Sequence, residues 1–577
     1  MHLQGRSLIA GTASGSILFS QTPLSFWGGT DSATGRIVDE HHPLCGESLK
    51  GKVLAIPCGR GSCSGSNAIL EMMLNGNAPA ALVFTEREEI LTAGVIVAQV
   101  LFERSIPVLL LGKGDFAKLE HVSSATLESS ILSFDGPSAT NVTLPQISMQ
   151  IRSVANFTSL ELAAKDRDVL DGRSGSAAAM AMRIIFIFAS VQGATELVDI
   201  SQSHLDSVLY TGPATLMFAE RLLALGGAKF AVPTTMNALS IDLQRWQQHN
   251  VDANFAEKAN KLASAYVATG AKPTFTCAPY LLDTAPSAGE QVGWAESNAV
   301  VFANSVLGAR TQKYPDLVDV CIALTGRAPL VGCHTDAGRL PSIAIQAPSP
   351  HTTGFDHDLF WPLLGYQVGD ISGSQIPLVL GLEANQPSMA DLKAFGAAFA
   401  TTSSASMFHI RGVTPEHAIL QQRMPRIDVA ATDLQKCHRR LNSAADESVD
   451  VIALGNPHFS FEEFEALAAL LQKYDPRHKD KESRIRLMVT TSRFTYDKIT
   501  QCEIADALQH FGAELITDTC WCIIQESTIG NAGTDGTIMT NSAKYAHYGP
   551  GLVGRKIHFG SLRECVMTYF RGRREPV

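Results

Sequence analysis

The first 140 residues alternate short apolar runs with segments rich in glycine, proline and serine. Four of the runs, ILFS, KVLAIP, ALVF and PVLLLG, have the length of buried strands. Only the stretch after Asn67 and the stretch Ile96–Glu103 have helical spacing. We therefore predict a β-rich small domain over residues 1–140, with a linker rich in Ser, Thr and Pro over Ser123–Gln146.

Helical and strand patterns alternate from about residue 150 to residue 577, which predicts a second, larger domain of the α/β class. Capping boxes at Ser460–Glu463 and Ser561–Glu564 each open a helix directly after an apolar strand pattern. Pro213 opens another helix in its first turn. Open α/β sheets bind ligands outside the carboxyl ends of their strands, so we expect the chemistry in the turns that follow these strands.

Composition narrows the class of protein. A formal net charge of -10 argues against a duplex-binding protein, which normally presents a basic face. The longest apolar run, Ile184–Val191, is too short to span a bilayer, and the first residues do not resemble a signal peptide. We expect a cytoplasmic enzyme without a nucleic-acid or membrane partner, acting on a small molecule as a monomer or homo-oligomer.

The tract GRGSCSGSN, Gly59–Asn67, stands between a strand pattern and a helix pattern. Backbone N–H groups at such a turn, together with the positive end of the helix dipole, bind anions such as carboxylates. Gly61, Ser62 and Ser64 are therefore candidates for contact with a substrate. The alternative is a tight glycine turn whose serines only cap the helix.

Eleven cysteines are scattered along the chain, and none forms a C-x-x-C pair. Cys277, Cys520 and Cys565 lie in turn-like or helix-start settings, where thiolates are favoured. Three thiolates from separate loops could hold an iron–sulfur cluster with one iron left open as a Lewis acid. The alternative for each is a small buried hydrophobic residue.

Several polar side chains follow strand patterns or open helices and could share one cleft with these cysteines. The candidates for substrate binding are His204, Asn237, Ser297, Asn298 and Lys544. The alternatives are structural histidines, helix caps and solvated residues.

The order and length of these motifs identify a resemblance to the aconitase X family. PLSFWGGTDSATGRIVDEHHPLCGESLKGKVLAIPCGRGSCSGSNAI resembles its swivelling small domain. LDGRSGSAAAMAM, PTTMNA, TCAPY, WAESNAVVFANSVLGART, GNPHFS, TDTC and TNSAKYAHYG resemble its catalytic domain. The resemblance covers nearly the whole chain, with the small and large parts fused.

This resemblance implies an aconitase-like large domain, a β-rich swivelling domain and a dehydratase that uses an iron–sulfur cluster, with 2Fe–2S favoured over 4Fe–4S. It implies Cys277, Cys520 and Cys565 as cluster ligands, with Cys333 and Cys522 as further candidates. It also implies a proton-abstracting serine, Ser64 with Ser62 as its competitor, although Cys63 and Gly65 stand where relatives commonly have serines.

The family has two substrate classes, cis-3-hydroxy-L-proline and mevalonate 5-phosphate. A phosphate favours clustered cations, whereas Arg60, Arg310 and Lys544 are isolated in the sequence. We therefore expect loss of the α-hydrogen and 3-hydroxyl of cis-3-hydroxy-L-proline, giving 1-pyrroline-2-carboxylate, with mevalonate 5-phosphate as the alternative. A metal-free amino-acid racemase and a cluster-sensing RNA-binding protein are alternatives of other classes.

Overall fold

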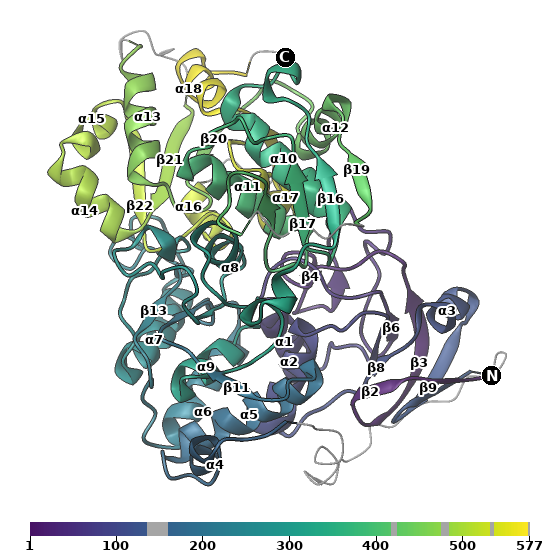
Figure 1. Cartoon of the computed structure of the whole chain (residues 1–577). Coiled ribbons are helices and arrows are strands. Elements are labelled where there is room, and N and C mark those ends of the chain that lie inside the picture. Colours follow the sequence, from purple (N-terminus) through teal and green to yellow (C-terminus); the bar gives the residue numbers. More distant parts are fainter. Residues whose placement is uncertain (135–159, 417–423, 475–483, 531–535, 575–577) are drawn as a thin grey trace. The chain divides into compact units, whose positions relative to one another are not determined.

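The computed structural model describes residues 1–134, 160–416, 424–474, 484–530 and 536–574 (Figure 1). The chain forms two compact units. Unit 1 comprises Met1–Ser203, Thr211–Thr234 and Tyr314–Val331, and unit 2 comprises His204–Tyr210, Thr235–Lys313 and Gly332–Val577. Unit 1 is thus larger than the segment 1–140 that the sequence predicts as a domain.

Unit 1 is built on an eight-stranded sheet of order β1-β10-β9-β3-β6-β7-β8-β2. The bounds are β1 His2–Gln4, β2 Arg6–Ile9, β3 Thr12–Phe19, β6 Val53–Ala55, β7 Ala81–Phe84, β8 Val108–Leu110, β9 Ser124–Glu128 and β10 Ile131–Ser133. Strands β3, β6, β7 and β8 run parallel, and the other pairings are antiparallel. Only Gly5 separates β1 from β2, which lie at opposite ends of the strand order, so the sheet curls until its edges meet.

The serine-rich tract lies in the first of two β-α-β crossovers. Helix α1 (Gly65–Asn75) connects β6 to β7, and α2 (Ile90–Phe102) connects β7 to β8. The β-rich character of the segment is confirmed, but the linker prediction is wrong in its first part. Residues 124–133 form β9 and β10, whose Leu127 and Leu132 are fully buried in the core of the sheet. The rest of the predicted linker, 135–146, lies outside the described residues.

Unit 1 contains further helices in the described part of the chain. They are α3 Lys113–Phe116, α4 Ala164–Leu170, α5 Ser176–Gln192, α6 Pro213–Ala224 and α9 Val318–Thr325. Helix α5 contacts α2, α4 and α9, and α6 contacts α1. Short strands complete the unit: β4 Thr30–Asp31 pairs with β5 Arg36–Ile37, and β11 Leu197–Asp199 pairs with β15 Arg327–Pro329.

Unit 2 contains a five-stranded parallel sheet of order β22-β21-β20-β23-β24. Its strands are β20 Val451–Leu454, β21 Arg486–Thr491, β22 Ala513–Thr517, β23 Thr537–Thr540 and β24 Lys556–Phe559. The interleaved helices are α13 Phe461–Leu471, α14 Arg493–Gln501, α15 Ile504–His510, α16 Glu526–Ile529, α17 Ala543–Val553 and α18 Leu562–Arg571. Both predicted capping boxes are confirmed, at Ser460 and Ser561.

A second parallel sheet of unit 2 has the order β18-β17-β16-β19. Its strands are β16 Ile343–Gln346, β17 Pro377–Leu380, β18 His409–Ile410 and β19 Arg426–Asp428, with helices α10 His357–Ser372, α11 Met389–Thr402 and α12 Ala431–Leu441. Elements that precede it are α7 Ala253–Thr269, α8 Ser297–Phe302 and the small sheet β13 Thr234–Met236, β12 Ser203–Leu205 and β14 Gly293–Trp294. The predicted α/β class is confirmed. No helix in the described part of the chain is long and apolar enough to cross a membrane.

Candidate active site

The serine-rich tract forms the turn between β6 and α1 in unit 1. Gly61 takes a left-handed conformation, with a φ of 85°, that other residues rarely adopt. The Ser62 Oγ accepts a hydrogen bond of 3.3 Å from the Ser64 backbone N–H and lies 3.4 Å from the Ser64 Oγ. Ser64 precedes the first residue of α1, is fully buried, and does not use its side chain to cap the helix. Both hydroxyls therefore lie at the positive end of the α1 dipole.

The other polar residues of the tract are held by partners within unit 1. The Arg60 guanidinium forms an ion pair of 2.8 Å with Asp39. The Asn67 side chain donates to the Asp316 carboxylate at 2.6 Å. Arg60 and Asn67 therefore anchor the turn within unit 1.

Three thiols come together in unit 2. Cys277 lies between α7 and α8, Cys520 and Cys522 follow β22, and all three are buried. The pKa of the Cys520 thiol is raised well above its usual value, first by its hydrogen bond with the Cys277 thiol and then by burial, while a hydrogen bond with Cys522 lowers it. The cluster therefore consists of three sulfur donors from two loops.

Two residues of the turn after β20 bind these thiols. The Asn456 amide donates to the Cys522 Sγ at 3.0 Å, and the His458 backbone N–H donates to the Cys277 Sγ at 3.3 Å. The His458 ring contacts the Thr519 carbonyl oxygen at 2.8 Å, and burial lowers its pKa to about 4. The loops that follow β20 and β22 thus meet at the carboxyl edge of the sheet, as expected for an open α/β fold.

A buried ion pair lies in the same unit. The Lys544 Nζ is 2.9 Å from the Glu296 Oε1, and both residues are more than nine-tenths buried. Burial alone would lower the pKa of Lys544, but the charge of Glu296 and the nearby thiols raise it well above its usual value. Burial likewise opposes ionisation of Glu296, and Lys544 overcomes this and lowers its pKa. Both groups are therefore charged at neutral pH.

The predicted polar candidates of unit 2 surround this pair. Asn298 donates to Glu296 and, at 3.0 Å, to the Cys277 carbonyl oxygen, while Asn237 donates to the other Glu296 oxygen at 3.3 Å. Ser297 is the first residue of α8 and is buried. The His204 Nδ1 lies 2.8 Å from the Thr235 hydroxyl, and burial lowers the pKa of His204 to about 4 although Glu296 opposes this.

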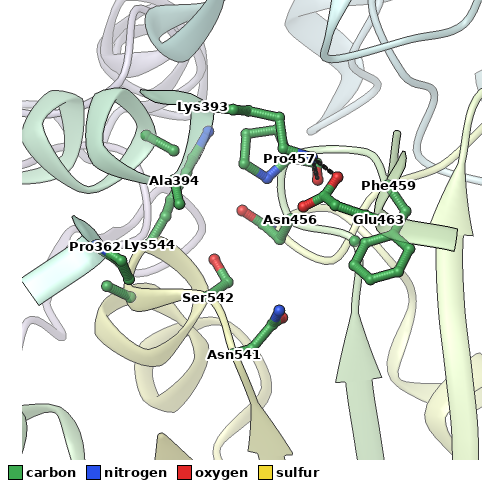
Figure 2. A pocket seen from close by; sticks show the side chains of 13 residues that line it. Pro362, Lys393, Ala394, Asn456, Pro457, Phe459, Glu463, Asn541, Ser542 and Lys544 are labelled. Atoms are coloured by element: carbon green, nitrogen blue, oxygen red, sulfur yellow. Dashed lines mark hydrogen bonds and ion pairs between the residues drawn. The ribbon is translucent and has the colours of Figure 1, made fainter. Parts of the chain in front are cut away.

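A cavity of about 30 Å³ lies against the turn after β20. Figure 2 shows Lys393, Asn456, Ser542 and Lys544 around it. The Lys393 ammonium donates to the His458 carbonyl oxygen at 2.8 Å and pairs with the Glu463 carboxylate. Lys393 therefore fixes the backbone whose N–H reaches the Cys277 thiol. Its place in α11, amid apolar residues, offered no clue to this role in the sequence.

Cys565 does not join the three thiols. It lies in the first turn of α18, as predicted, but its side chain is fully buried in a different hydrophobic cluster with Val566, Tyr569 and Phe570. Burial, followed by the charges of Glu564 and Asp358, raises the pKa of this thiol well above its usual value. The expected meeting of Cys565 with Cys277 and Cys520 is therefore corrected, and Cys522 takes its place beside them. These four residues share one apolar face at helical spacing, and this pattern in the sequence indicates that the Cys565 thiol faces the core.

Comparisons with known proteins cover nearly the whole chain. Family models match four successive segments: the aconitase X swivel domain at residues 2–133, the first domain at 159–337, the second at 341–439 and the third at 449–571. The chain is 50% identical to a cis-3-hydroxy-L-proline dehydratase of Hypocrea jecorina over 98% of this chain and 94% of the relative. It is 47% identical to a protein of the same name from Pseudomonas aeruginosa, over 98% and 96%.

More distant relatives match part of the chain. The phosphomevalonate dehydratase large subunit of Methanothermobacter thermautotrophicus is 32% identical over 67% of this chain and 92% of its own. The solved structure of Thermococcus kodakaraensis aconitase X in its holo-form matches with a TM-score of 0.63 and 27% identity. It covers 70% of this chain and 99% of that chain.

Proposed function

Because the chain belongs to the aconitase X family, we propose that it is a hydro-lyase that dehydrates cis-3-hydroxy-L-proline. The observation that carries the proposal is the 50% and 47% identity, over nearly the whole chain, to two dehydratases of that substrate. The phosphomevalonate dehydratase relative is less similar, at 32% identity over two thirds of the chain. In the reaction the Cα–H and C3–O bonds break, water leaves, and the enamine tautomerises to 1-pyrroline-2-carboxylate.

Cys277, Cys520 and Cys522 are the residues that would hold an iron–sulfur cluster, with 2Fe–2S favoured. Three buried thiols in mutual contact fit this group because cysteine sulfur is its usual ligand. Within the described residues no three His, Cys, Asp or Glu side chains are arranged to hold a single metal ion. When such a cluster is bound, an iron with an open coordination position would supply a Lewis acid for the departing hydroxyl.

Ser64 is the proposed acceptor of the α-proton. A serine hydroxyl is a weak base, and the position of Ser64 at the start of α1, where the helix dipole favours negative charge, lowers the cost of the alkoxide. Ser62 and the Gly61 backbone donate hydrogen bonds to the substrate carboxylate, whose charge must be stabilised while the α-carbon loses its proton.

Unit 2 supplies further proposed donors to the substrate. His204, Asn237, Ser297, Asn298 and Lys544 contact the polar groups of the substrate. Glu296 holds Lys544 and both asparagines in fixed orientations. The side-chain NH2 of Asn237 already donates to Asp206 and Glu296, and that of Asn298 to Glu296 and the Cys277 carbonyl oxygen. The further N–H groups of Lys544 are therefore the preorganised donors. The pair also keeps Lys544 cationic, which suits an anionic substrate.

The test is incubation of anaerobically purified protein with cis-3-hydroxy-L-proline and, separately, with mevalonate 5-phosphate, followed by NMR of the products. We expect 1-pyrroline-2-carboxylate from the first substrate and no turnover of the second. Iron is assayed in the same sample. Epimerised hydroxyproline from iron-free protein would instead indicate a racemase, and dehydration of mevalonate 5-phosphate alone would replace the substrate assignment.

A further inference from the structure

The first turn of α1 is bonded to a residue that lies 249 positions further along the chain. The Asn67 Nδ2 donates to the Asp316 Oδ2 at 2.6 Å, and the Ser66 Oγ donates to the Asp316 carbonyl oxygen at 3.2 Å. The Asp316 backbone N–H is 3.4 Å from the carbonyl oxygen of Cys63, the residue before Ser64. Asp316 thus contacts residues on both sides of Ser64. Asn67, Ser66 and Asp316 are essentially fully buried.

The opposite side of this turn is held by α2. A Cβ at Gly94 would lie 2.4 Å from the Ser66 carbonyl oxygen, so only glycine allows α2 to pack this closely. The Ser66 hydroxyl also donates to the Cys63 carbonyl oxygen at 2.9 Å. The backbone around Ser64 is therefore confined between α2 and Asp316.

The residue after Asp316 has an unusual backbone conformation. The next residue, Leu317, has a φ of 74° and a ψ of -34°, a region that non-glycine residues rarely adopt and that strains the backbone. Helix α9 starts directly after it and packs on α5. The packing of α9 thus overcomes local strain and presents both the Asp316 backbone and its carboxylate to the serine turn.

From these contacts we infer that Asp316 is a positioning residue that sets the location of Ser64. The inference rests on the proposed function insofar as Ser64 accepts the α-proton. The Asp316 carboxylate also lies at the N-terminal turn of α1, where negative charge is favourable. Removing the Asp316 side chain removes the acceptor of the Asn67 bond, so residue 316 keeps only its two backbone hydrogen bonds, with Ser66 and with Cys63, to the turn around Ser64.

The experiment compares full-length wild-type protein with Asp316→Ala and Asp316→Asn. Amide hydrogen exchange of peptides covering residues 59–70 should become at least tenfold faster in Asp316→Ala, while peptides covering 449–460 stay unchanged. A displacement of about 1 Å should lower kcat roughly 100-fold. KM and iron content should change little, because the Cys277, Cys520 and Cys522 thiols belong to unit 2. Asp316→Asn, which keeps an oxygen acceptor for Asn67, should lie between.

Asp166→Ala is the matched control, because Asp166 is equally buried and pairs at 2.7 Å with Arg327, which belongs to the same segment 314–331. It should lower thermal stability without changing exchange over 59–70. If Asp316→Ala does not fold, Asn67→Ala removes the side-chain bond from the other partner. Unchanged exchange over 59–70 overturns the inference whatever the substrate is. Faster exchange in a protein whose wild type does not dehydrate hydroxyproline refutes the proposed function instead.

Discussion

Replacement of Lys544 by Met tests whether the buried ion pair organises unit 2. Methionine has a similar length and keeps the packing, but it leaves Glu296 as a buried carboxylate without a cation. Asn298 and Asn237 continue to donate to it, so hydrogen bonding is retained and the loss is one of charge. Breaking a buried pair in this way costs about 3–5 kcal/mol of unfolding free energy.

The expected shift in melting temperature follows from the size of the unit. With about 330 residues in unit 2 and an unfolding entropy of roughly 2.1 cal/mol/K per residue, the entropy is about 0.7 kcal/mol/K. The melting temperature should therefore fall by about 4–7 °C at pH 8. Lys436→Met, which removes an exposed pair with Asp433, should shift it by about 1 °C or less.

The pH dependence gives a second criterion. In the wild type Lys544 lowers the pKa of Glu296, so the pair stabilises the fold above the usual glutamate pKa of 4.5, and this contribution is lost as the pH falls. In Lys544→Met burial raises the pKa of Glu296, so protonation relieves the buried charge. The difference in melting temperature between the wild type and Lys544→Met should narrow between pH 8 and pH 5 in thermal scans followed by circular dichroism. The double variant Lys544→Met/Glu296→Gln should recover most of this difference in melting temperature. A difference below 1 °C for Lys544→Met, or one that the double variant retains, would refute the argument.

Three further outcomes concern the reaction. Cys522→Ser should remove iron, measured per chain, together with activity, whereas Cys565→Ser should keep both; loss of iron from Cys565→Ser alone would reverse the ligand assignment. Ser64→Ala should lower kcat by several orders of magnitude at nearly constant KM, and Ser62→Ala should mainly raise KM, so steady-state kinetics with the opposite result would exchange the two roles. Asp518, two residues before Cys520, has a φ of 68° and pairs with Arg493 through both carboxylate oxygens. Asparagine tolerates this backbone conformation better than alanine, so Asp518→Ala should lower iron occupancy more than Asp518→Asn. Equal iron in both variants would contradict this prediction.

Much of the fold could be predicted because local patterns agree with it. The capping boxes at Ser460 and Ser561 and the proline at residue 213 mark helix starts that the structure contains. The strands β9 and β10 were missed because Ser, Thr and Glu interrupt their short apolar pattern, and only Ala125, Leu127 and Leu132 of their residues belong to the core cluster. Their stability comes from pairing with β1 and β3, which no local pattern records.

The site was predictable by residue type but not by grouping. Polar candidates such as Asn237, Asn298 and Lys544 meet at Glu296 because strands distant in sequence end at neighbouring places. For the cysteines, the position near a helix start described Cys565 correctly, but only its apolar spacing with Val566, Tyr569 and Phe570 indicates that the thiol faces the core. Asp316 was missed because the bond to Asn67 depends on tertiary structure alone.

The long separation between Asn67 and Asp316 has a consequence for synthesis of the chain. Residue 316 leaves the ribosome about 249 residues after residue 67, which at roughly 5–20 residues per second takes about 12–50 s. During that interval β6, α1, β7 and α2 can already be complete, while the serine turn lacks its bonds with Asp316. The N-terminal segment should therefore emerge as a folded but inactive body, and proton-abstracting geometry should arise only when the segment 314–331 docks. Ribosome-bound chains ending before residue 314 would then be protected at the sheet and susceptible to protease at residues 59–67.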